Sequence, residues 1–131
     1  MEKNLWYNNS KDAGKATLPE RSFTMASKIK DEKLDFLFEA ILTLETVEDC
    51  YSFFEDLCTV SELQEMSRRM QAARMLRANA VYADIAAQTG LSTATISRVN
   101  RCLKYGSDGY NKALDKLEAS RHPGVTDRRR S

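Results

Sequence analysis

The sequence lacks the features that mark membrane, secreted and low-complexity proteins. It has only 5 glycines and 2 prolines in 131 residues, which argues against a low-complexity or wholly disordered chain. No apolar run approaches the roughly 20 residues of a membrane-spanning helix, and residues 1–10 lack the apolar stretch of a secretory signal. We therefore expect one domain in a soluble, cytoplasmic protein with no membrane partner.

Residues for metal binding and catalysis are equally scarce. The cysteines, Cys50, Cys58 and Cys102, are odd in number and show no C-x-x-C spacing, which argues against a disulfide framework or a zinc site. Cys50 and Cys58 lie among apolar residues, so we expect small buried thiols. The single histidine, His122, stands beside a proline, with no nucleophile or phosphate-binding glycine loop to accompany it. The sequence therefore predicts no catalytic residue, no metal site and no enzyme.

The formal net charge of +1 conceals a strong asymmetry along the chain. Residues 31–58 contain nine acidic groups and one lysine, whereas residues 59–105 contain seven basic groups and three acidic ones. An acidic segment followed by a basic one favours two surfaces with different partners. Two solvated helix surfaces are the alternative, and we interpret Arg74 and Arg77 mainly in that way.

Helical periodicity dominates the middle of the chain, and no strand-like alternation persists. Thr59 followed by Glu62 forms a capping box at the start of one helix, and Asn79 suits the left-handed residue that follows its end. The predicted helices cover about 31–44, 47–57, 60–78, 82–88, 92–104 and 108–118. The fold class is therefore all-α, with about six helices.

Both ends of the chain lack apolar periodicity. Residues 1–27 combine asparagine, glycine and proline with several charges, so we predict a disordered N-terminal extension. Met25 opens the periodic part and could be an alternative start. Residues 119–131 are rich in arginine, and we predict a basic flexible tail. Residues 28–118 between them form the predicted helical domain.

The most informative stretch runs from Tyr82 to Val99 and meets the requirements of a helix-turn-helix. Ala86 supplies a small residue where the two helices cross, and Gly90, four residues later, suits a tight turn with positive φ. The apolar positions that lock the two helices together are Ile85, Leu91, Ile96 and Val99. We therefore predict a helix-turn-helix over about 82–104, with an ordinary helical hairpin as the alternative.

The second helix of this motif presents a short polar surface suited to a DNA groove. Ser92 can cap its N-terminus, whose positive dipole end favours a phosphate or a base edge. Arg98 and Arg101 can engage guanine edges or phosphates, and Ala94 permits close approach to the bases. The predicted DNA-binding residues are Ser92, Thr93, Ala94, Thr95, Ser97, Arg98, Arg101 and Lys104. The expected partner is double-stranded DNA, and a protein-interaction module with the same fold is the alternative.

Three strings in the chain are similar to the Trp repressor superfamily, and most similar to its YerC/YecD-type branch. They are Cys58-Thr-Val-Ser-Glu-Leu-Gln-Glu-Met-Ser-Arg-Arg69, Thr89-Gly-Leu-Ser-Thr-Ala-Thr-Ile-Ser-Arg98 and Cys102-Leu-Lys-Tyr-Gly106. The resemblance covers about residues 31–118. It implies a six-helix, intertwined homodimer that represses transcription by binding a palindromic operator. It also implies a DNA-facing side made by Thr93, Ala94, Thr95 and Ser97.

The same resemblance implies a ligand pocket. In tryptophan-responsive relatives the corepressor lies between two arginines, which match Arg69 and Arg98 here, and Thr59 matches a further pocket residue. The glycine that lies against the indole ring in those relatives is Val99 in this chain. A β-branched side chain occupies space that the ring needs, and overpacking costs ~1–3 kcal/mol. We therefore expect no tryptophan cofactor, while another small-molecule corepressor stays open.

The first two predicted helices are apolar over more than one face. Phe36 and Phe53 lie off the main apolar stripes, and such helices usually pack against more than one partner. A single helix-turn-helix also reads few base pairs, whereas two copies related by a two-fold axis span two half-sites. We predict a C₂ homodimer with its acidic helices remote from DNA. A wider monomer core is the alternative.

Overall fold

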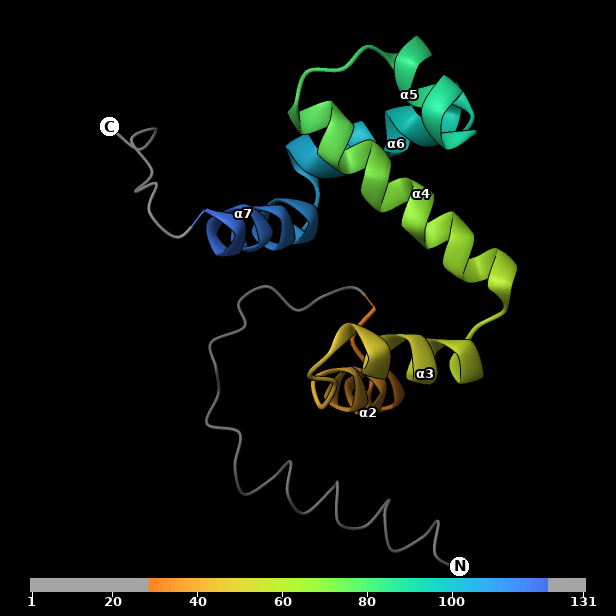
Figure 1. Cartoon of the computed structure of the whole chain (residues 1–131), viewed down its shortest axis with the longest axis vertical. Coiled ribbons are helices and arrows are strands. Elements are labelled where there is room, and N and C mark those ends of the chain that lie inside the picture. Colours follow the sequence, from red (N-terminus) through yellow and green to blue (C-terminus); the bar gives the residue numbers. More distant parts are fainter. Residues whose placement is uncertain (1–28, 123–131) are drawn as a thin grey trace, which may run out of the picture. The chain divides into compact units, whose positions relative to one another are not determined.

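A computed structural model of the chain describes residues 29–122, which form six α-helices and no strand. The helices are α2 (Glu32–Ile41), α3 (Val47–Leu57), α4 (Val60–Arg77), α5 (Tyr82–Thr89), α6 (Thr93–Tyr105) and α7 (Gly109–Arg121) (Figure 1). The predicted all-α fold is confirmed. The chain divides between Thr46 and Val47 into two compact units. The predicted N-terminal extension, Met25 and the tail beyond His122 lie outside the described residues.

The bounds of α4 follow the capping chemistry of the sequence. The Thr59 hydroxyl accepts a hydrogen bond from the Glu62 backbone N–H at 3.1 Å, and the Thr59 N–H donates to the Glu62 carboxylate at 2.8 Å. This reciprocal pair is the predicted capping box. After the other end of the helix, Asn79 has a φ of 62°, the left-handed conformation expected there.

The last helix is longer than its apolar pattern predicts. The prediction ended near Glu118, one residue after the last apolar position, Leu117, but α7 continues to Arg121. Glutamate, alanine and arginine have high helix propensity and need no apolar contact to continue a helix. Hydrophobic periodicity reports burial, and so it stops before the helix does.

The hydrophobic core lies where α5 and α6 pack against the C-terminal half of α4, as Figure 1 shows. Its buried members are Ala72, Ala73, Ile85, Leu91, Ile96, Val99 and Leu114. Ala72 and Ala73 are fully buried, and their small side chains allow α6 to approach α4 closely. Leu114 brings α7 into the same core.

Large apolar side chains stay exposed on the helices before this core. They are Phe36 and Phe38 of α2, Leu42 at its C-cap, Val47, Tyr51 and Leu57 of α3, and Val60 and Met66 of α4. Neither α2 nor α3 has a buried residue. The expectation of buried thiols is wrong for Cys50, which is exposed, and Cys58 is only half-buried. The physical reason is that α3 contributes no side chain to the core.

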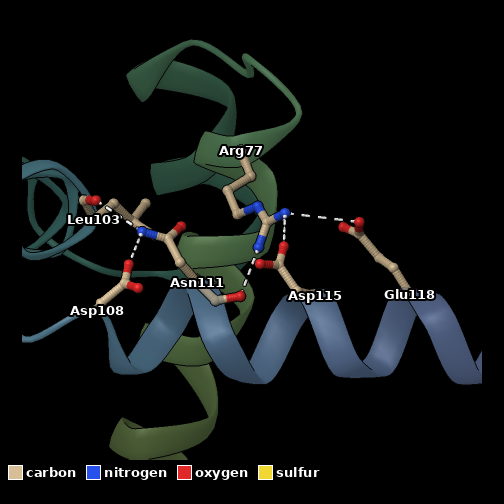
Figure 2. A network of polar contacts seen from close by, with 6 residues as sticks. All are labelled: Arg77, Leu103, Asp108, Asn111, Asp115 and Glu118. Atoms are coloured by element: carbon tan, nitrogen blue, oxygen red, sulfur yellow. Dashed lines mark hydrogen bonds and ion pairs between the residues drawn. The ribbon is translucent and has the colours of Figure 1, made fainter. Parts of the chain in front are cut away.

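The end of α4 is tied to α7 through Arg77. Its guanidinium donates from Nη1 to the Asn111 carbonyl at 3.1 Å and from Nη2 to the Asp115 carboxylate at 2.7 Å (Figure 2). The Glu118 carboxylate lies 3.7 Å from Nη2. The interpretation of Arg77 as a solvated surface residue is therefore wrong, and its side chain is only 26% exposed. Arg74 fits that interpretation, since it is exposed and donates to the neighbouring Gln71.

Asn111 extends the same network to α6. Its side-chain amide donates to the Leu103 carbonyl at 2.9 Å and to the Asp108 carboxylate at 3.0 Å (Figure 2). Leu103 lies in the last turns of α6, and Asp108 precedes α7. One residue of α7 therefore contacts the C-terminal ends of both α4 and α6.

We expect Arg77→Met to lower the free energy of unfolding by about 1–2 kcal/mol, because it removes two hydrogen bonds from a charged donor and partly exposed ion pairs. Urea denaturation measures the difference. Arg74→Met is the matched control one turn earlier, and it should change the free energy by less than about 0.5 kcal/mol. Equal, small effects of the two substitutions would show that the network does not stabilise the fold.

Candidate nucleic-acid interface

The turn between α5 and α6 is built around Gly90 and Thr89. Gly90 has a φ of 75°, and its N–H donates to the Ala86 carbonyl at 2.9 Å, which closes α5. A Cβ at this position would meet no atom within 4 Å, so the backbone conformation, and not a shortage of space, favours glycine. The buried Thr89 hydroxyl donates to the Ile85 carbonyl at 2.7 Å and accepts from the Leu91 N–H at 3.2 Å. The turn therefore has the geometry that the sequence predicts.

The four predicted locking positions of the motif are all buried. Ile85 and Ile96 are fully inaccessible, and Val99 and Leu91 are 2% and 6% exposed. The sequence analysis missed a polar contact between the same helices, in which the Asn100 side-chain amide donates to the Tyr82 hydroxyl at 3.1 Å. Asn100 lies one turn after Ile96, which is the signal that could have placed it on the inward side of α6.

Ser92 caps α6 as predicted. Its hydroxyl accepts from the Thr95 N–H at 3.2 Å and donates to the Thr95 hydroxyl at 3.0 Å. The Thr95 side chain is therefore engaged in the cap and is half-buried, whereas Thr93 and Ala94 are exposed. The first turn of α6 presents its free backbone N–H groups beside these two small side chains.

The structure gathers the predicted DNA-binding residues on α6 and its cap. Those exposed to solvent are Ser92, Thr93, Ala94, Arg98, Arg101 and Lys104, and those half-buried are Thr95 and Ser97. None of them is packed into the core. No acidic residue interrupts α6, so its solvent-facing side is cationic. Such a surface is complementary to a polyanion.

Three of the four residues of the predicted ligand pocket have contacts within the chain, and Arg98 is the exception. Thr59 forms the capping box of α4, and the Arg69 guanidinium lies 3.7 Å from the Glu65 carboxylate. Arg98 is exposed to solvent. Val99 belongs to the hydrophobic core and is 2% exposed, so its side chain fills interior space.

Residues 29–122 also have three features that bear on metal binding, catalysis and membranes. No group of three or more histidine, cysteine, aspartate or glutamate side chains in this part of the chain could hold a metal ion. His122 is exposed just after α7. Of the described helices, none combines the length and apolarity needed to cross a bilayer.

Comparisons with known proteins agree with this geometry. The Trp repressor protein family model matches residues 32–118. The uncharacterized protein YerC of Bacillus subtilis is 52% identical over 91 residues, which are 70% of this chain and 88% of YerC. A TrpR-like protein from Eubacterium eligens has a TM-score of 0.67 and 49% identity, over 70% of this chain and 94% of that one. A Trp repressor candidate from Staphylococcus aureus has a TM-score of 0.66 and 52% identity, over 70% and 91% of the two chains.

The match therefore spans the whole of α2 to α6 and all but the last three residues of α7. It includes the core of α4, α5 and α6 and the acid-free surface of α6. The chain belongs to the Trp repressor family, a family of non-enzymatic, helix-turn-helix DNA-binding regulators.

Proposed function

We propose that this protein is a sequence-specific DNA-binding transcriptional regulator, a repressor, that binds a palindromic operator as a homodimer in the cytoplasm. The observation that carries the proposal is the cationic surface of α6, held outward by Ile96 and Val99 on a buried helix-turn-helix core. In this geometry the first turn of α6 enters the major groove, where side chains meet base edges. Family membership supports the same conclusion.

Arg98 is the base-reading candidate. It is exposed and lies one turn after Ala94, which leaves its guanidinium free to reach a guanine edge bidentately. Genomic fragments selected by the purified protein, and an unrelated duplex of equal length, provide the two DNA probes. We expect the affinity for both probes to fall steeply as salt rises, because phosphate contacts release counterions.

Arg98→Ala should weaken binding to the selected fragment by about tenfold or more and binding to the unrelated duplex much less. Fluorescence anisotropy titrations measure both affinities. Lys33→Ala, which removes one positive charge from α2, is the control and should leave both affinities within about twofold. Equal losses of affinity for the two duplexes would show that Arg98 contacts the DNA backbone and not a base. A wild-type protein that retards no fragment at low salt would favour a protein-interaction module instead.

The homodimer follows from the exposed apolar surface of α2, α3 and the start of α4. Leu42 is 83% exposed, Val60 70% and Phe36 57%, and none of the three belongs to the hydrophobic core. Large exposed apolar side chains on the helices of a soluble protein are typical of a protein interface. A second copy of the chain brings an identical surface and a second α6 for the other half of a palindrome.

We expect light scattering after size exclusion to give twice the chain mass of 14.9 kDa at micromolar concentration. Leu42→Glu should convert the dimer to a monomer or weaken it at least tenfold, because it places a charge in an apolar interface. Glu39→Gln on the same helix should leave the mass unchanged. Circular dichroism of each variant checks that the helices still form. A wild-type mass of 14.9 kDa would refute the homodimer.

Tryptophan is not the corepressor in this proposal, because Val99 is packed into the core where responsive relatives have glycine. Isothermal titration calorimetry with tryptophan at about 1 mM should show no binding heat. The affinity for the operator should be the same with and without tryptophan. Val99→Ala tests whether the volume of the Val99 side chain excludes tryptophan. If it does, the variant should bind tryptophan. Micromolar tryptophan binding by the wild-type protein would contradict the prediction.

A further inference from the structure

The solvent-exposed side of α6 includes Tyr105, which the prediction of DNA-binding residues omitted. Because an α-helix has 3.6 residues per turn, Ala94, Arg98, Arg101 and Tyr105 lie along one side of α6, opposite the buried Ile96 and Val99. Tyr105 is 85% exposed, although tyrosine carries a large apolar ring. It is the last residue of the helix, and Lys104 beside it is exposed as well.

The length of α6 separates the roles of its two ends. The helix has 13 residues, which at 1.5 Å per residue give it a length of about 20 Å. The major groove of B-form DNA is only about 12 Å wide. If the axis of α6 runs across the groove with its first turn at the base edges, its last turn lies at the wall of the groove, where the phosphates are.

We propose that Tyr105 is a phosphate-contacting residue of the DNA interface. Its phenolic hydroxyl donates a hydrogen bond to a backbone phosphate oxygen, and Arg101 and Lys104 provide the positive charge around that contact. The small side chains of the first turn, Thr93 and Ala94, read bases at the other end. This inference rests on the proposed DNA binding, and it goes further by assigning the two ends of α6 to different parts of the duplex.

Tyrosine is neutral, so its contribution differs measurably from that of a basic residue. A neutral donor releases no counterion, and its removal lowers affinity without changing how steeply affinity depends on salt. Removal of Arg101 lowers affinity and also reduces the salt slope by about one unit. Neither contact selects a sequence, so both losses are equal for operator and unrelated DNA.

The test uses the full-length Tyr105→Phe variant with the selected genomic fragment and a random-sequence duplex of the same length, over a salt series. We expect about tenfold weaker binding to both duplexes with an unchanged salt slope, because the variant loses one hydrogen bond to a charged acceptor. Arg101→Gln should reduce the salt slope on the same two duplexes. Thermal unfolding of Tyr105→Phe should match the wild type, since the side chain lies outside the core.

Two results would overturn the assignment of Tyr105. Unchanged affinity of Tyr105→Phe for both duplexes would show that the hydroxyl makes no contact with DNA. A loss confined to the selected fragment would show that it reads a base instead of a phosphate. Either result leaves the proposed function standing as long as the wild-type protein binds the fragment. A wild-type protein that binds neither duplex refutes the proposed function and this inference together.

Discussion

The close packing of α6 on α4 is the constraint on which the rest of the structure depends. Ala72 and Ala73 are fully buried at this contact, and Ile96 and Val99 of α6 belong to the same core. Larger side chains on α4 would separate the two helices, since protein interiors are packed too densely to absorb added volume. The position of α6 in turn decides which of its residues face solvent. The composition of α4 therefore controls the surface that α6 presents.

Apolar packing sets the spacing of these helices, but the hydrophobic effect has no preferred direction, so polar contacts help to set their rotation and tilt. Three polar contacts supply that direction. Asn100 of α6 donates to Tyr82 of α5, Asn111 of α7 donates to the Leu103 carbonyl of α6, and Arg77 of α4 donates to the Asn111 carbonyl. Hydrogen bonds have narrow distance and angle limits. The contacts of Asn100 and Leu103 therefore help to hold the middle and the C-terminal end of α6 in one orientation against α5 and α7.

Sequence reasoning succeeded where the structure is determined by near neighbours. Gly90, the Ser92 cap and the capping box of Thr59 each depend on residues within four positions, so spacing alone identifies them. The pairing of Arg77 with Asp115 joins residues 38 positions apart, and no periodic pattern reports it. The exposure of Cys50 was missed for a related reason. An apolar pattern shows that a helix needs a partner, but it does not show whether the same chain supplies one.

The acidic residues and the exposed apolar side chains are concentrated in the same part of the chain. Residues 31–58 contain nine of the 19 acidic residues, and their helices also leave large apolar side chains exposed. Acidic side chains disfavour contact with phosphates, so the apolar surface on these helices suits the proposed second copy of the chain better than it suits DNA. The acid-free α6 has the opposite character. Charges more than about 8 Å apart in physiological salt are largely screened from each other. A net charge of +1 is therefore compatible with a local surface that attracts DNA, because the duplex responds to the residues near it and not to the sum over the chain.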